Sequence, residues 1–197
     1  MKIKKVEMQR KLVHMVFGVL TVLLIKFGLI GATHIFFLVI FSIIISFLIK
    51  RYRMPLIHFL MANLERDENI KSFPAKGLIF YLIGIFLVLS FFPLDIAMSS
   101  ILVLAFADSI GHLFGIRFGK IPHLFVSKKS VEGWIAGLIA GFLAAFVLVP
   151  WYEALAASFF AMLVEGIEIK IGADELDDNL IIPLVAASAI WVIRILL

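Results

Sequence analysis

The sequence contains no cysteine among its 197 residues, which excludes disulfide bonds and metal sites built on thiolate ligands. Charge is also scarce: Asp, Glu, Lys and Arg make up 16% of the chain, against 63% hydrophobic residues and a mean hydropathy of +1.12. No polar stretch is long enough for a separate soluble domain, and there is no internal repeat or low-complexity tract. Together, these absences indicate a single integral-membrane domain.

Seven apolar runs approach or reach the roughly 18–20 residues that a helix needs to cross a bilayer. They are 12–31, 33–49, 76–92, 94–115, 133–150, 151–169 and 180–197. We therefore predict an all-α, polytopic transmembrane bundle of about seven spans. The N-terminal lysines resemble the start of a signal peptide, but the apolar run that follows has no clear cleavage site and further spans come after it. Between the second and third spans, the apolar spacing after Pro55 predicts a short amphipathic helix at the membrane surface.

Basic residues gather in alternate segments of the chain. Residues 1–11 hold five Lys and Arg, 50–76 hold six, 117–129 hold four, and one more lies at position 170. The positive-inside rule then predicts a cytoplasmic N-terminus and an outer C-terminus. Because the three outer turns are very short, we expect the active site to face the cytoplasm. The net charge of +4 is explained by this topology and indicates no nucleic-acid partner.

One acid lies deep in the fourth apolar run. A charged side chain at that depth costs roughly 2.5–3.5 kcal/mol on insertion scales, and such a residue marks a functional site. Asp108 and His112 are four residues apart and share a helix face with Gly111, Gly115 and Gly119. Close packing of membrane helices explains the glycines but not the acid. We predict that Asp108 is a magnesium ligand or a base.

A basic, glycine-rich loop follows this span. Gly119-Lys120 is no Walker A motif, because the four-residue gap and the hydroxyl after the lysine are missing. Ser130 is predicted to cap the fifth span, with Glu132 in its first turn. Two lysines precede this helix start, whose free N–H groups suit an anion. Acids beside such a loop indicate a site for a metal-bound polyphosphate.

Further acids lie where the sixth and seventh spans approach each other. Glu165 is near the end of the sixth span, and 174–179 leads into the seventh. A solvated loop with Asp178 or Asn179 as the helix N-cap accounts for part of this run. Alternatively, Asp177, Asp178 and Asn179 hold a second magnesium ion or orient an attacking hydroxyl.

Together these residues resemble the membrane-bound, CTP-dependent lipid-alcohol kinases: dolichol, phytol and farnesol kinases and the yeast-type diacylglycerol kinase. The resemblance covers most of the chain, and its central block is the most specific part. The motifs that carry it are Arg10-Lys11-x-x-His14, Lys76-Gly77 with Tyr81, Asp108 with the glycines to Gly119-Lys120, Lys128-Lys129-Ser130-x-Glu132-Gly133, Glu165, and Asp178-Asn179-Leu180 with Pro183.

The phosphatidate and archaeal-lipid cytidylyltransferases resemble the same central block. They continue into a Gly-His-Gly-Gly signature near the C-terminus, and this chain has Asp177-Asp178-Asn179-Leu180 in the corresponding region. The absence of Gly-His-Gly-Gly from this chain favours the kinases.

The resemblance implies one membrane kinase domain over residues 1–197 that transfers the γ-phosphate of CTP, with Mg²⁺, to an isoprenoid alcohol such as dolichol, phytol or geranylgeraniol. A CTP-dependent diacylglycerol kinase and a CTP:lipid-phosphate cytidylyltransferase are the alternatives. An ion or small-anion transporter is disfavoured, because the outer halves of the spans lack the polar groups of a transport path. The oligomeric state stays open.

The resemblance also implies roles for individual residues. The catalytic set is Asp108, Asp178, Glu165 and His14. The metal ligands are Asp108, Glu132, Asp178 and Asn179. The nucleotide-binding set is Arg10, Lys11, Gly115, Arg117, Gly119, Lys120, Lys128, Lys129, Ser130 and Gly133.

Overall fold

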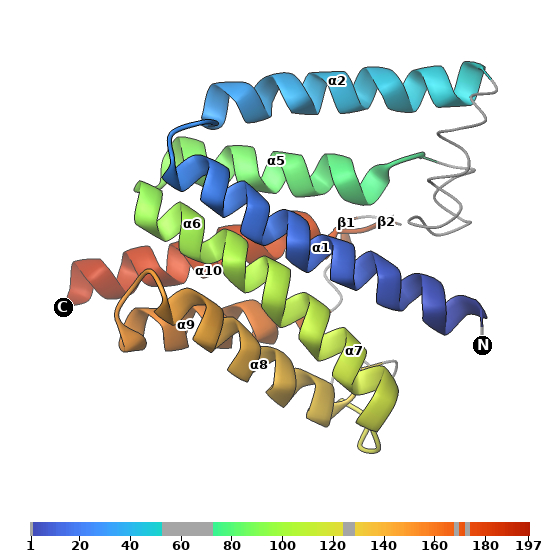
Figure 1. Cartoon of the computed structure of the whole chain (residues 1–197). Coiled ribbons are helices and arrows are strands. Elements are labelled where there is room, and N and C mark those ends of the chain that lie inside the picture. The colour runs from blue at the N-terminus through green and yellow to red at the C-terminus, as the bar shows by residue number, and fades with distance from the viewer. Residues whose placement is uncertain (1, 53–72, 124–128, 168–169, 172–173) are drawn as a thin grey trace.

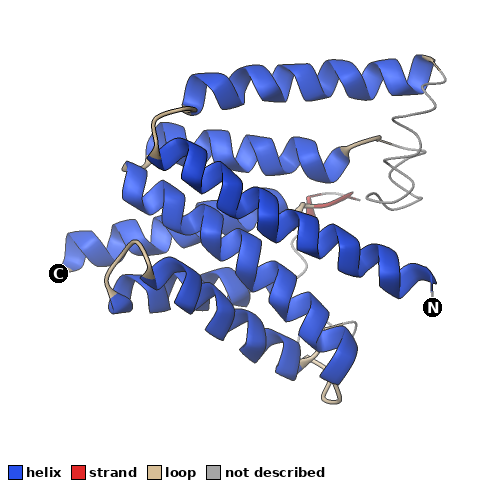
Figure 2. Cartoon of the chain, in the orientation of Figure 1, coloured by secondary structure: helices blue, strands red, loops and turns tan. Residues whose placement is uncertain are grey.

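The computed structural model describes residues 2–52, 73–123, 129–167, 170–171 and 174–197. Within them, helices form most of the chain (Figure 2), and the only named strands are a two-residue antiparallel pair, β1 (Lys170–Ile171) and β2 (Asp174–Glu175). The predicted helical membrane bundle is confirmed. The amphipathic helix expected after Pro55 falls in 53–72, outside the described residues.

A helix occupies each predicted span. The helices are α1 (Lys2–Lys26), α2 (Ala32–Arg51), α5 (Lys76–Phe91), α6 (Leu94–Val103), the π-helix η1 (Leu104–Asp108), α7 (Ser109–Phe118), α8 (Val131–Phe146), α9 (Trp151–Glu165) and α10 (Asp178–Leu196). The three segments α6, η1 and α7 follow one another without a break and form a single long helix.

Four of the described helices are long and apolar enough to cross a membrane: Glu7–Lys26, Ala32–Arg51, Leu94–Phe118 and Asp178–Leu196. The helices α5 and α8 are apolar but only 16 residues long, and α9 has 15. A count of seven spans and the cytoplasmic position of the N-terminus stay predictions.

The α6–η1–α7 helix forms the centre of the bundle (Figure 1). It is by far the most buried of the four long helices, and α1, α5, α8, α9 and α10 pack against it. Alanines are buried on this helix and on α9, among them Ala105, Ala107, Ala157 and Ala161. Small side chains allow membrane helices to approach closely, so this centre is held by tight packing.

Glycines bring α7 and α8 together. A Cβ atom added at Gly133 would lie 2.7 Å from the Gly111 carbonyl oxygen and 3.0 Å from the Gly115 Cα atom. Only glycine fits at that separation. The expected role of the glycine stripe in helix packing is confirmed.

Charged residues also meet at the end of the bundle remote from Asp108. Arg194, in the last turn of α10, donates to both carboxylate oxygens of Glu153 at 3.0 and 2.6 Å. Its third nitrogen lies 2.8 Å from Asp95 Oδ2. These residues link α10 to the first turns of α9 and α6.

Candidate functional site

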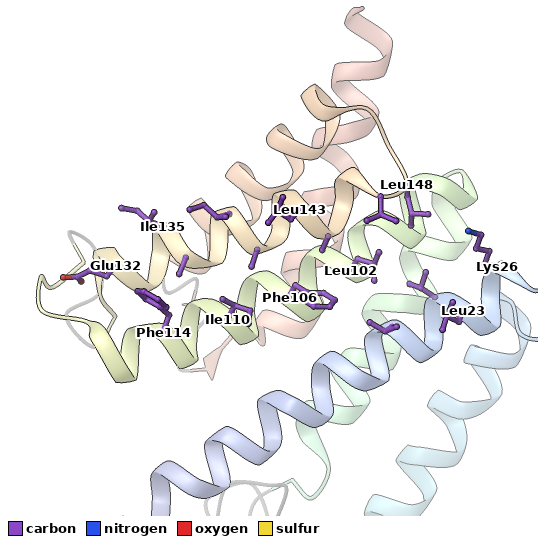
Figure 3. Close-up of a pocket in the computed structure, with 17 residues that line it drawn as sticks. Leu23, Lys26, Leu102, Phe106, Ile110, Phe114, Glu132, Ile135, Leu143 and Leu148 are labelled. Carbon is purple, nitrogen blue, oxygen red and sulfur yellow. The ribbon is translucent and has the colours of Figure 1, made fainter.

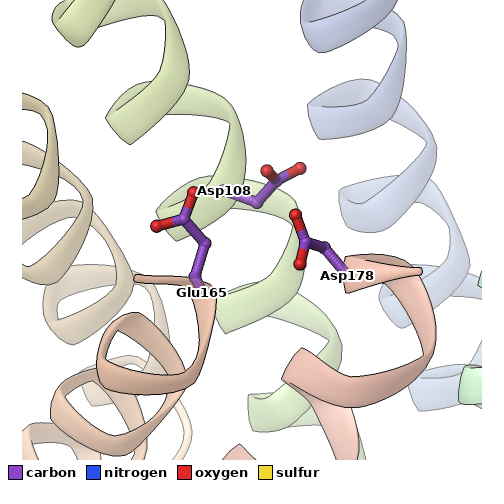
Figure 4. Close-up of side chains that lie close together, drawn as sticks. All are labelled: Asp108, Glu165 and Asp178. Carbon is purple, nitrogen blue, oxygen red and sulfur yellow. The ribbon is translucent and has the colours of Figure 1, made fainter. Parts of the chain in front are cut away.

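Three carboxylates converge inside the bundle from different helices (Figure 4). Asp108 ends η1, Glu165 ends α9 and Asp178 begins α10. One oxygen of each lies within 4.8 Å of the others, so these three side chains form a carboxylate group that a metal ion can bridge. Asp108 is 6% and Glu165 9% exposed. Oxygen donors of this kind are those that Mg²⁺ prefers, and the donor set therefore fits this ion.

The π-helix η1 delivers Asp108 to this group. A π-helical turn is rare, and it occurs frequently at functional sites because it changes the direction of the side chains around it. Lys11 Nζ lies 2.5 Å from Asp108 Oδ2, and His112 Nε2 lies 3.4 Å from Glu7 Oε2. Because Glu7 and Lys11 are one turn apart on α1, Asp108 and His112 face the same side, as their spacing predicts.

Lysine ammonium groups neutralise part of the carboxylate group. Besides the Lys11–Asp108 pair, Lys129 Nζ lies 2.6 Å from Glu165 Oε1 and 3.8 Å from Asp178 Oδ2. It also donates to the main-chain oxygen of Glu165. Burial alone would lower the pKa of Lys129, but the nearby carboxylates of Glu165 and Asp178 outweigh it and raise that pKa above its usual value. With all five groups ionised, three carboxylates and two ammonium groups leave one net negative charge.

His14 and Tyr81 lie beside these charges. Their ring centroids are 5.1 Å apart in an edge-on arrangement, and they join α1 to α5. The Nε2 atom of His14 is buried and has no hydrogen-bond partner within the described residues. A buried nitrogen in that condition is costly unless a bound molecule satisfies it.

A polar cavity of about 280 Å³ adjoins the carboxylate group. It lies between α7, the loop after it, α8 and α9, and Lys129 and Glu165 belong to its lining. Six of the ten residues predicted to bind nucleotide line it: Gly115, Gly119, Lys120, Lys129, Ser130 and Gly133.

The loop between α7 and α8 is shaped by main-chain bonds. Pro122 and Ser130 form an isolated antiparallel bridge, and the His123 amide donates to the Lys129 carbonyl at 2.9 Å. Ser130 Oγ accepts from the Gly133 amide at 3.1 Å, which confirms Ser130 as the N-cap of α8. Lys128, which is also predicted to bind nucleotide, lies outside the described residues.

The structure places two predicted metal ligands elsewhere. The Glu132 carboxylate accepts from the amides of Lys120 and Ile121 at 3.1 and 3.2 Å, so it holds the loop in place. The Asn179 amide nitrogen donates to the Gly77 carbonyl at 3.3 Å and joins α10 to α5. Neither residue belongs to the carboxylate group.

The N-cap of α10 differs from the prediction. Asp177, rather than Asp178 or Asn179, caps this helix, with its Oδ1 accepting from the Asn179 amide at 3.1 Å. The one-residue shift places Asp178 in the first turn, where its side chain is directed at the other acids (Figure 4).

Three basic residues of the predicted nucleotide set lie apart from the cavity lining. Arg10 pairs with Glu7 at 2.7 Å, Lys11 pairs with Asp108, and Arg117 stands over the Phe118 ring at the end of α7. The sequence alone did not predict this division among the basic residues.

The cavity also contains residues that sequence reasoning missed. Trp134 and His123 line it with ring centroids 6.4 Å apart, and Trp134 Nε1 donates to the Met162 carbonyl at 2.7 Å. The one available signal was the position of Trp134, a single helical turn after the predicted cap Ser130.

A second, larger cavity opens on another side of the α7–α8 pair. It is an apolar groove of about 990 Å³ between α1, the central helix and α8 (Figure 3). Its walls include Leu23, Phe106 and Leu143, and the only charged residues in its described lining are Lys26 and Glu132. The groove follows α8 from Glu132 to Val147, or roughly 22 Å at the rise of an α-helix.

Known proteins resemble this chain over most of its length. An uncharacterized protein of Methanocaldococcus jannaschii is 32% identical over 93% of this chain and 92% of its own. The CTP-dependent diacylglycerol kinase 1 of Schizosaccharomyces pombe is 27% identical over 96% of this chain and 94% of its own. Its Saccharomyces cerevisiae namesake is 25% identical over 76% of this chain and 53% of its own.

The chain belongs to the CTP-dependent lipid kinase family. It is accordingly a phosphotransferase and an integral membrane protein, as the sequence motifs predict. No protein-family model and no solved structure matches it.

The geometry meets the demands that phosphoryl transfer makes on such a kinase. This reaction depends on charge neutralisation and in-line placement more than on covalent chemistry with the protein. A cavity lined by two lysines and a helix N-terminus shares Lys129 and Glu165 with the carboxylate group. A phosphate chain in the cavity would therefore end beside the acids.

Proposed function

We propose that this protein transfers the γ-phosphate of CTP to the hydroxyl of diacylglycerol at the cytoplasmic face of the membrane. One observation carries the proposal. Glu165 of the carboxylate group, and Lys129 that pairs with it, also line the polar cavity. The choice of CTP and of diacylglycerol is supported by the names of the S. pombe and S. cerevisiae relatives. An isoprenoid alcohol is the alternative acceptor that the sequence resemblance suggests.

Nucleotide binding is assigned to the polar cavity. The amides at the start of α8, which begins after Ser130, bind phosphate oxygens together with Lys120 and Lys129. Glycines at 115, 119 and 133 let α7, the residue after it and the start of α8 pack closely along this wall of the cavity. The Trp134 and His123 rings form the part of the cavity wall that would contact the cytosine base of CTP.

Asp108 and Glu165 are the proposed magnesium ligands. Mg²⁺ usually takes one or two carboxylates besides phosphate oxygens and water, so two acids suffice. When bound, Mg²⁺ neutralises the charge that develops on the β- and γ-phosphates. Glu132 and Asn179 support the site by holding the loop and α5.

The acceptor hydroxyl is assigned to a position in contact with His14 and Asp178. The unpartnered Nε2 of His14 orients the hydroxyl, and Asp178, the most exposed of the three acids, takes its proton. The hydroxyl oxygen bonds to the γ-phosphorus, the bond from that phosphorus to the bridging oxygen breaks, and CDP leaves.

The apolar groove is the proposed site of the acceptor's tail. It has an almost wholly apolar lining, runs most of the thickness of a bilayer's hydrocarbon core and ends at Glu132, whose carboxylate contacts the cavity residues Lys120 and Ile121. Ala140→Trp would narrow the groove. We expect it to raise the KM for long-chain diacylglycerol while leaving the KM for CTP unchanged. An unchanged KM for both would remove the groove from the acceptor site.

The function is tested with detergent-purified protein, Mg²⁺ and γ-labelled CTP or ATP. The acceptors are diacylglycerol, geranylgeraniol, phytol, dolichol and phosphatidic acid. Label in phosphatidic acid formed from diacylglycerol, with CTP preferred over ATP, is the expected result. Label in an isoprenyl phosphate would identify the alternative acceptor. Labelled pyrophosphate together with a CDP-lipid would identify a cytidylyltransferase and overturn the proposal.

A further inference from the structure

Lys129 occupies the position of a cation within the carboxylate group. Its Nζ atom lies between two of the three acids, 2.6 Å from Glu165 and 3.8 Å from Asp178. The side chain is 29% exposed, and it lines the polar cavity. An ammonium group between two carboxylates has the sign of charge and the contacts that a bound divalent ion would have.

Lys11 differs from Lys129 in the number of acids that it contacts and in its position relative to the polar cavity. It contacts only Asp108 among the three acids, its side chain is 9% exposed, and it is absent from the lining of the cavity. A phosphate bound in the cavity would therefore contact Lys129, which borders both the acids and the cavity, and would not contact Lys11.

A divalent ion at Glu165 and the ammonium of Lys129 exclude each other. Both bind the carboxylate of Glu165, and like charges a few ångströms apart in a partly buried site repel strongly. The ammonium must leave its carboxylates when the ion arrives, and a charged group that loses its partner in such a site is costly. A triphosphate in the cavity supplies the new partner.

We propose that Lys129 keeps divalent metal out of the free site and admits it only together with the nucleotide. The ammonium moves from Glu165 and Asp178 to the phosphates as the metal takes the carboxylate of Glu165. This inference rests on the proposed nucleotide site, and it makes metal binding and nucleotide binding mutually dependent.

The test measures Mn²⁺ binding to the detergent-purified full chain without nucleotide, by electron paramagnetic resonance. We expect Lys129→Met to bind Mn²⁺ at least about tenfold more tightly than the wild type. Lys129→Gln, which keeps a polar side chain, should show the same direction, and Lys129→Arg should keep the weak binding of the wild type. Lys50→Met changes an exposed lysine of α2 and serves as the matched control.

The site of the additional Mn²⁺ is identified by a second change. Adding Glu165→Gln to Lys129→Met removes a proposed ligand and should return the affinity to the wild-type value or below it. Lys129→Met should also weaken CTP binding, because the phosphates lose a positive partner. General unfolding of the variant would weaken the binding of both Mn²⁺ and CTP. Tighter Mn²⁺ binding together with weaker CTP binding therefore distinguishes the proposed effect from unfolding.

Two outcomes overturn the inference. One is a wild-type protein that binds Mn²⁺ without nucleotide as tightly as the Lys129→Met variant. The other is a natively folded Lys129→Met and Lys129→Gln pair in which Mn²⁺ affinity falls or stays the same. Phosphate transfer by the wild type is measured separately. If transfer occurs together with either of these outcomes, the proposed kinase activity is retained and only the inference about Lys129 is overturned. If Lys129→Met binds Mn²⁺ more tightly but the wild type shows no transfer, the competition between Lys129 and the metal ion is supported and the kinase activity is not.

Discussion

Lys11 and Asp108 are 97 positions apart in the sequence, and their side chains form a buried ion pair with Nζ 2.5 Å from Oδ2. The pair joins α1 to the last residue of η1. It fixes the depth at which Asp108 meets Glu165 and Asp178. The acid that the sequence singles out is therefore held in place by a lysine that the sequence assigned to the nucleotide.

Asp108→Asn should reduce phosphate transfer by at least about a hundredfold, because the amide keeps the shape of the side chain but loses the charge that binds metal. Transfer from γ-labelled CTP measures the loss, and membrane insertion should be unchanged. Asp174→Asn, in β2, is the matched control and should matter little. Wild-type turnover in Asp108→Asn would remove this residue from the site.

The Lys11–Asp108 pair should show strong coupling in a double-mutant cycle. Lys11→Met alone leaves a buried carboxylate unpaired, which costs about 3–5 kcal/mol. Asp108→Asn alone leaves the buried ammonium of Lys11 without its charged partner. We expect the double variant to lose less stability than the sum of the single variants, measured by thermal unfolding in detergent. Strict additivity would contradict the pairing.

Gly137→Ala should impair transfer without removing any chemical group. The added Cβ atom would lie 2.7 Å from the Ala107 carbonyl oxygen, so the backbone next to Asp108 must shift. A displacement of about 1 Å can cost up to a hundredfold in rate, and we expect a loss of tenfold or more in kcat. Gly31→Ala is the control, because a Cβ atom there meets nothing within 4 Å.

Arg194→Met should lower the unfolding temperature and leave the activity of the folded protein unchanged. The change leaves the buried carboxylate of Glu153 without its two hydrogen bonds, far from the carboxylate group. Lys26→Met changes another basic residue on the same predicted side and should have a much smaller effect on stability. A loss of kcat that exceeds the loss of folded protein would contradict this purely structural role.

Chelation of divalent ions should abolish transfer, and Mg²⁺ or Mn²⁺ should restore it. Ca²⁺ should restore it poorly, because it prefers more ligands at longer distances than two carboxylates and a phosphate chain provide. Glu165→Gln should raise the Mg²⁺ concentration needed for half-maximal rate. Full activity in the presence of excess chelator would exclude the proposed metal.

The positions of the helices could be predicted closely from the sequence. The run 76–92 corresponds to α5 (Lys76–Phe91), and the predicted cap Ser130 is the N-cap of α8. Apolar length and cap residues are local properties of the chain, so the sequence suffices for them. The one-residue error at Asp177 arose because three adjacent polar residues are all acceptable caps, and packing chose among them.

The sequence by itself determined that this chain is a membrane bundle and that most of its charges gather in alternate segments. It also predicted that Asp108 and the Lys129 loop carry the chemistry. Only the tertiary structure decided which charges meet. Glu165 lies beside Asp108 and Asp178, whereas Glu132 accepts hydrogen bonds from the loop after α7 and Asn179 donates to α5. Such partners depend on the rotation of each helix about its axis and on the extra turn geometry of η1. No local pattern encodes these, because they are set by the packing of helices that are distant in the chain.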